Sequence, residues 1–122
     1  MLIYSCSDLI FSTKIRSTAE ILQVESRPAR NIDMLRARLD RVEDGKVNES
    51  VTCVMIDLEM GEHAFDMIKL ASGHEAKPTV IAFAPHVMTG AIAGAERVGA
   101  DVVMARGAFT NQLPELVKQY GE

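Results

Sequence analysis

The residue of this chain best placed to do chemistry is Asp57, which ends an apolar run. The run begins at Val51, and a turn containing Gly61 follows the acid. Such a run is typical of a strand that is buried on both faces and ends in a polar residue at the carboxyl edge of a parallel sheet. In open α/β sheets ligands bind at that edge. Asp57 is therefore the first candidate functional residue.

The cysteines and histidines of this chain do not have the spacing of a metal-binding site. Cys6 and Cys53 show no metal-binding pattern and no secretory context, so we expect reduced, buried thiols. A disulfide between them is not predicted, because Cys53 lies roughly 13 Å down its strand, away from the edge where Cys6 belongs. His63, His74 and His86 lie in different segments, which argues against a zinc site.

Length and composition indicate one small domain over residues 1–122. The chain has 122 residues, of which 48% are hydrophobic, so it can bury a core without disulfides. The net charge of -4 argues against a nucleic-acid surface or a basic membrane patch. Arginines between residues 27 and 41 alternate with acids and are interpreted as a solvated helix face. With no basic leader and no membrane-length apolar segment, we expect a cytoplasmic protein.

Apolar runs alternate with helical patterns along the whole chain. Helical periods cover residues 11–22, 32–42, 64–71, 91–98 and 109–120, with Pro114 expected in the first turn of the last helix. Gly99 is placed to end a helix, and Asp44-Gly45 and Ser72-Gly73 indicate loops. The alternation predicts a parallel sheet with helices on both faces. The candidate strands are 2–5, 28–30, 51–57, 79–84 and 101–105.

The order of these elements, the acid-ending strand, Val80–His86 and Glu96–Asp101 together resemble the receiver domain of bacterial two-component response regulators. The resemblance covers essentially the whole chain. It implies an α/β, flavodoxin-like, doubly wound (βα)5 fold with a five-stranded parallel sheet in the order 2-1-3-4-5. It also implies a Mg²⁺-dependent site with an acidic pair, a phosphoacceptor Asp, a Thr or Ser, and a Lys-Pro.

This sequence matches that pattern only at Asp57. Ser5 and Cys6 stand where the resemblance implies the acidic pair, Ala84 replaces the hydroxyl residue, and Arg106 followed by glycine replaces Lys-Pro. Mg²⁺ is usually held by one or two carboxylates with phosphate and water. Beyond Asp57, the only ligands left to Mg²⁺ are a backbone carbonyl near Glu59 and a displaced Asp8. We therefore expect no cofactor and no metal, apart from weak Mg²⁺ at Asp57 if that residue is phosphorylated.

Arg106 keeps a cation near the acceptor position. We hypothesise a constitutive Asp57–Arg106 ion pair that locks one state, since a guanidinium can bond a carboxylate with two N–H groups. In the structural alternative, Asp57 only accepts hydrogen bonds from the backbone of the following turn, and Arg106 is a surface cation.

A partner surface is also implied by the resemblance. Its candidate residues are Met88, Ile92 and Met104, around a helix rich in small residues between Gly90 and Ala95. The alternative is that glycine and alanine let this helix pack closely on its own sheet. The partner is expected to be a protein, whether a kinase, an output protein or a second copy in a homodimer.

Three functions stay open. The first is a stand-alone pseudo-receiver, which is not an enzyme and acts through protein contacts with little or no Mg²⁺-dependent Asp phosphorylation. The second is an atypical response regulator phosphorylated at Asp57. The third is a small flavodoxin-like enzyme or ligand-binding domain, although the only candidate phosphate loop is Ser5–Asp8.

Overall fold

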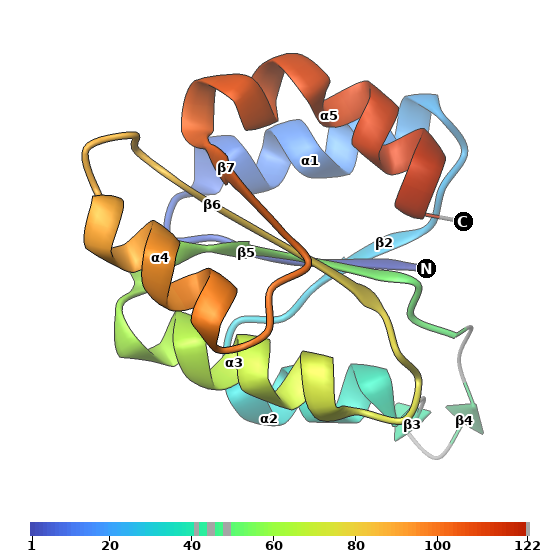
Figure 1. Ribbon diagram of the computed structural model, residues 1–122. Coiled ribbons are helices and arrows are strands. Elements are labelled where there is room, and N and C mark those ends of the chain that lie inside the picture. The colour runs from blue at the N-terminus through green and yellow to red at the C-terminus, as the bar shows by residue number, and fades with distance from the viewer. Residues whose placement is uncertain (41, 44–45, 48–49, 122) are drawn as a thin grey trace.

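The centre of the molecule is a parallel sheet of five strands. The computed structural model describes residues 1–40, 42–43, 46–47 and 50–121. The sheet order is β2-β1-β5-β6-β7, which is 2-1-3-4-5 when the sheet strands are counted along the chain (Figure 1). The predicted α/β, flavodoxin-like fold is therefore confirmed. The strands are β1 (Leu2–Ser5), β2 (Ser26–Pro28), β5 (Cys53–Asp57), β6 (Thr79–Ala84) and β7 (Val102–Ala105).

Helices cover both faces of this sheet (Figure 1). One face carries α1 (Leu9–Ile21) and α5 (Arg106–Tyr120). The other carries α2 (Ile32–Leu39), α3 (Glu62–Gly73) and α4 (Thr89–Arg97). A 3-10 turn, η1 (Leu58–Met60), follows β5, and α2 is followed by an antiparallel pair, β3 (Val42–Glu43) and β4 (Lys46–Val47). Within the described ranges, no helix is both long and apolar enough to cross a bilayer.

The core has two layers, one on each face of the sheet. On β5, Val54 and Ile56 pack with the side chains of α2, α3 and α4, whereas Cys53 and Met55 pack with those of α1 and α5. Because β5 is buried on both faces, its sequence is a continuous apolar run. Because all five strands are parallel, their carboxyl ends meet at one edge, and β5 delivers Asp57 there.

Capping residues fix where the first two helices begin. The Asp8 carboxylate accepts a hydrogen bond from the Phe11 N–H at 2.7 Å, and the Asn31 side chain accepts one from the Met34 N–H at 2.8 Å. Each cap satisfies a backbone donor that the first helical turn leaves free. Asp8 is thereby held at the carboxyl edge of the sheet.

Gly99 ends α4 as predicted. Its φ of +119° lies in the region that residues with a Cβ rarely adopt, and an added Cβ would stand 2.6 Å from the Ser72 Oγ atom. Glycine is required here both by backbone conformation and by the close approach of α3.

Several predicted boundaries were wrong by a few residues. The weak strand at 28–30 lies at Ser26–Pro28, and the strands predicted from 51 and 101 begin at Cys53 and Val102. The helix predicted over 32–42 ends at Leu39, because the chain turns there into β3. Residues 72–73 form the last turn of α3 and are not a loop. The loop predicted at 44–45 lies outside the described residues.

The position predicted for Pro114 was also wrong. The last helix begins at Arg106, so the proline lies in the interior of α5. It cannot donate a hydrogen bond to the Thr110 carbonyl. Pro114 is on the exposed side of the helix, where water can bond that carbonyl.

Candidate functional site

Asp57 lies at the carboxyl edge of β5 with its carboxylate already hydrogen-bonded. The residue is fully buried. One carboxylate oxygen accepts from the Glu59 N–H at 2.9 Å, and the other accepts from the Ser7 N–H at 3.1 Å and the Ser7 hydroxyl at 2.7 Å. Asp57 thus caps η1 and joins it to the loop after β1. These bonds match the structural alternative that the sequence left open, in which Asp57 binds the backbone of the following turn.

Arg106 does not pair with Asp57, so the hypothesised ion pair is wrong. Its Nη2 atom lies 2.7 Å from the Asp8 carboxylate and 3.5 Å from the Glu59 carboxylate. The guanidinium carbon is 4.3 Å from the centre of the Phe11 ring, which adds a cation–π contact. The physical reason is that both Asp57 oxygens are occupied by Ser7 and Glu59 donors, whereas Asp8 and Glu59 retain oxygens for a cation.

Three carboxylates converge at this edge. One oxygen each from Asp8, Asp57 and Glu59 lies within 4.8 Å of the others, and no further group of three metal-binding side chains occurs among the residues that the structure describes. Oxygen donors in this number suit Mg²⁺. In the arrangement present, however, the Arg106 guanidinium binds two of the three carboxylates. In this structure the cluster is therefore occupied by a guanidinium.

The other predicted pocket residues, Ser5, Cys6 and Ala84, offer the cluster no metal ligand and no reactive nucleophile. The Ser5 hydroxyl is buried and contacts the Met60 sulfur at 3.2 Å and the Met67 sulfur at 3.6 Å. Ala84 is fully buried and has no polar group to offer. Burial raises the pKa of the Cys6 thiol to about 12, so Cys6 is a poor nucleophile at neutral pH.

The cysteines and histidines play no part in the cluster. Both thiols are free, as predicted, and burial raises the pKa of Cys53 to about 12. The His74 Nε2 atom lies 2.8 Å from the Asp40 carboxylate, at the ends of α3 and α2. His63 and His86 are exposed. This agrees with the prediction that the three histidines do not form one site.

Sequence reasoning did not predict the contacts of two residues in the cluster, although Ser7 lies within the candidate phosphate loop Ser5–Asp8. Ser7 donates two hydrogen bonds to Asp57, and Phe11 lies beneath the Arg106 guanidinium. Phe11 also stacks on Phe83, with ring centres 5.3 Å apart. Its helical period identified Phe11 as a core residue, but the period alone gives no sign of the cation above it.

The predicted partner residues are only partly exposed. Met88 and Ile92 pack against the core beneath α4, and Met104 packs against the core beneath α5. A Cβ at Gly94 would lie 3.1 Å from the Phe65 ring, so the small residue here permits close packing of α4 on α3, whereas the alternative had placed the close contact on the sheet. The large apolar side chain most exposed near α4 is Val87, at 72%.

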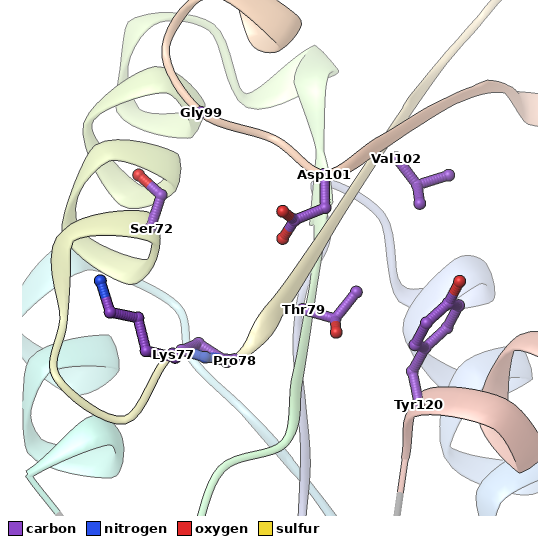
Figure 2. Close-up of a pocket in the computed structure, with 8 residues that line it drawn as sticks. All are labelled: Ser72, Lys77, Pro78, Thr79, Gly99, Asp101, Val102 and Tyr120. Carbon is purple, nitrogen blue, oxygen red and sulfur yellow. The ribbon is translucent and has the colours of Figure 1, made fainter.

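A separate cavity opens at the opposite edge of the sheet (Figure 2). Its volume is about 470 Å³, and it lies among the end of α3 and the starts of β6 and β7. The Asp101 carboxylate points into it and accepts a hydrogen bond from the Val80 N–H at 2.8 Å (Figure 2). The Lys77 ammonium lies on another wall. The lining therefore carries both signs of charge.

Comparison with solved structures places this fold among response-regulator receiver domains. A response regulator from Thermotoga maritima superposes with a TM-score of 0.75 at 18% identity, over 97% of this chain and 93% of that one. The receiver domain of NtrX from Brucella abortus gives a TM-score of 0.76 at 11% identity, over 98% and 96% of the two chains. The Mn²⁺-bound form of the response regulator Rcp1 gives 0.71 at 7% identity, over 99% and 94%.

These similarities establish the fold that the sequence resemblance implied, that of a receiver domain. The amino-acid sequence itself matches no protein-family model, and a search of curated proteins finds no relative. The chain therefore has the receiver architecture with a strongly divergent sequence.

Proposed function

We propose that this protein is a pseudo-receiver, a signal-transduction module that acts through protein contacts without Mg²⁺-dependent phosphorylation of Asp57. The observation that carries the proposal is the position of Arg106. Its guanidinium bridges Asp8 and Glu59, the two carboxylates that a divalent cation would need besides Asp57. A built-in cation thus replaces the metal, and the module needs no cofactor and has no catalytic activity.

The environment of Asp57 supports this proposal. A phosphoacceptor must present a carboxylate oxygen to the phosphoryl donor, with a metal to neutralise the charge that develops. Asp57 is fully buried, and its oxygens accept three hydrogen bonds. Ala84 offers no hydroxyl to bind a phosphoryl oxygen and couple it to loop movement. Phosphoryl transfer to Asp57 is therefore disfavoured, and so is the loop movement that would be coupled to it.

Signalling would then depend on which proteins bind the module. The partner would be a kinase, an output protein or a second copy of the chain. The face made by α4, β7 and α5 includes the half-buried Met88, Ile92 and Met104. Val87, in the segment just before α4, is exposed at 72%. We propose this face as the contact surface, with Val87 added to the residues that the sequence indicated.

An atypical phosphorylatable regulator is the second candidate, and the carboxylate cluster favours it. Asp8 supplies a carboxylate near the position of the missing acidic pair, within 4.8 Å of Asp57 and Glu59. Rcp1, which shares the fold, has been crystallised in a Mn²⁺-bound form. This candidate requires that Mg²⁺ displace Arg106 from two carboxylates at once.

Amide NMR on the full chain separates the two candidates. Two-dimensional spectra are recorded with millimolar Mg²⁺ and then with beryllium fluoride, which mimics a phosphoryl group, and a phosphorylatable receiver domain is treated in parallel as the positive control. The pseudo-receiver is expected to show no localised shifts. Shifts at Asp57, Glu59 and the loops after β1, β6 and β7 that vanish in Asp57→Asn would overturn the proposal.

A further inference from the structure

A second cavity at the carboxyl edge, between α1 and the segment that links β2 to α2, is rich in cations. Its volume is about 360 Å³, which is within the range of small-ligand sites. Arg16 from α1 and Arg30 from the linking segment both line it. Tyr4 from β1 and Thr13 from α1 add hydroxyl groups. Side chains from three elements therefore surround one space.

Among the residues that the structure describes, the two arginines of this cavity have no carboxylate partner. Arg27 pairs with Glu25, and Arg36 pairs with Asp33. Over residues 1–40, 42–43, 46–47 and 50–121, neither Arg16 nor Arg30 lies within ion-pair distance of a carboxylate.

Asp8 is the acidic residue in the lining of this cavity. Its carboxylate is bound by the Arg106 guanidinium at 2.7 Å and by the Phe11 N–H. The lining therefore carries two arginines against one aspartate, and that aspartate is already engaged by Arg106.

Tyr4 lies close to both arginines of this cavity. Burial raises the pKa of its phenol, while Arg16, Arg30 and Arg38 each act in the opposite direction. Guanidinium groups from three different elements therefore lie in the neighbourhood of Tyr4. Arg38 is itself held in place, because it donates to the Pro28 carbonyl at 3.2 Å.

We propose that this cavity binds a small phosphate-bearing molecule, whose phosphate is held by Arg16 and Arg30 and whose remainder lies over Tyr4 beside Thr13. A guanidinium group can donate two parallel N–H bonds to the oxygens of one phosphate. This favours phosphate over an anion that cannot accept two such bonds. The cavity in Figure 2 lacks this selectivity, since Asp101 offsets Lys77 in its lining. The proposed site lies beside the Asp57 cluster and needs neither a metal nor phosphorylation.

The test is a titration of the full chain with inorganic pyrophosphate, at constant ionic strength, followed by amide NMR. We expect saturable shifts at Tyr4, Thr13, Ala29 and Arg30. Arg16→Gln and Arg30→Gln are each expected to weaken binding roughly tenfold, since charge-assisted hydrogen bonds are among the strongest polar contacts. Arg97→Gln, at the end of α4, makes the same change in net charge far from the cavity and should leave the affinity unchanged.

Three results would overturn the proposal. The first is the absence of saturable shifts at these residues. The second is an equal loss of affinity in Arg97→Gln, which would indicate attraction by net charge alone. The third is a set of shifts confined to Asp57, Ser7 and Glu59, which would place the anion at the carboxylate cluster. Circular dichroism of each variant confirms that the fold is retained.

Discussion

Arg106, the first residue of α5, is joined to Asp8, the N-cap of α1, by an ion pair of 2.7 Å. The two helices that cover one face of the sheet are therefore joined at its carboxyl edge. The same guanidinium rests on Phe11 and reaches Glu59. Displacing Arg106 would therefore remove both its contact with Phe11 and its ion pairs with the two carboxylates.

Removing the Arg106 charge is expected to convert the cluster into a metal site. In Arg106→Gln, three carboxylates remain close together with no cation among them. Mg²⁺ affinity should rise roughly tenfold or more, since a unit charge at these distances is worth several times the thermal energy near a protein surface. Stability should change by only about 1 kcal/mol, because both partners are partly exposed. Calorimetric Mg²⁺ titration measures the affinity, with Arg97→Gln as the control; equal affinities in the two variants would show that Arg106 does not occupy the metal position.

Ser7 is predicted to stabilise the fold through Asp57. Ser7→Ala removes the 2.7 Å hydroxyl bond to a buried carboxylate and should lower the free energy of unfolding by about 1.5–3 kcal/mol, as expected for a bond to a charged group. Ser5→Ala is the matched control, because the Ser5 hydroxyl contacts only thioether sulfurs, which are weak acceptors. Urea denaturation measures both variants. A loss in Ser5→Ala as large as that in Ser7→Ala would mean that the Asp57 bond is not the cause.

Asp57→Asn is predicted to destabilise the protein. The carboxylate accepts from two backbone N–H groups and one hydroxyl, whereas an asparagine amide must turn its NH₂ toward one of these donors. We expect a loss of about 2–4 kcal/mol, because a donor that is left facing another donor loses its bond and stays desolvated. The measurement is the urea midpoint at neutral pH. An unchanged midpoint would contradict the prediction that these three hydrogen bonds stabilise the fold.

The sheet could be predicted from the sequence, whereas the pairing within the site could not. The alternation of apolar runs and helical periods determines the order of strands and helices along the chain. The apolar run that ends at Asp57 also places the end of one buried strand. The partner of Arg106 depends on which carboxylate at the edge still has a free oxygen, and that depends on the Ser7 and Glu59 donors. Sequence spacing carries no information on such competition.

The cationic cavity escaped prediction for a related reason. Arg30 was interpreted as part of a solvated, charge-mixed helix face, and that interpretation holds for Arg36, which pairs with Asp33. Arg30 instead lies between β2 and α2 and lines the same cavity as Arg16 of α1. Arg16 and Arg30 come to the same cavity only because the chain passes through α1 and β2 between them.

Gly99→Ala is predicted to be destabilising through both backbone and packing. The φ of +119° is unfavourable for alanine, and its Cβ would stand 2.6 Å from the Ser72 Oγ atom. We expect a loss of about 1–3 kcal/mol. Gly73→Ala is the matched control, because its Cβ would meet open space at the end of α3, and its stability should stay within about 1 kcal/mol of the parent protein. Thermal unfolding of both variants tests the prediction, and equal melting temperatures for the two would contradict it.

Alkaline unfolding is predicted to depend on Cys53. Burial raises the pKa of its thiol from the ordinary 9.0 to about 12, so the folded state holds its proton where the unfolded chain releases it. The stability that the neutral thiol contributes is complete below pH 9.0 and is lost between pH 9.0 and about pH 12. The slope for one proton is about 1.4 kcal/mol per pH unit. Cys53→Ala should therefore show a shallower fall in the urea midpoint than the parent protein above pH 9.0, after each is normalised to its own midpoint at neutral pH. An identical slope in the two proteins would mean that Cys53 titrates alike in the folded and unfolded states.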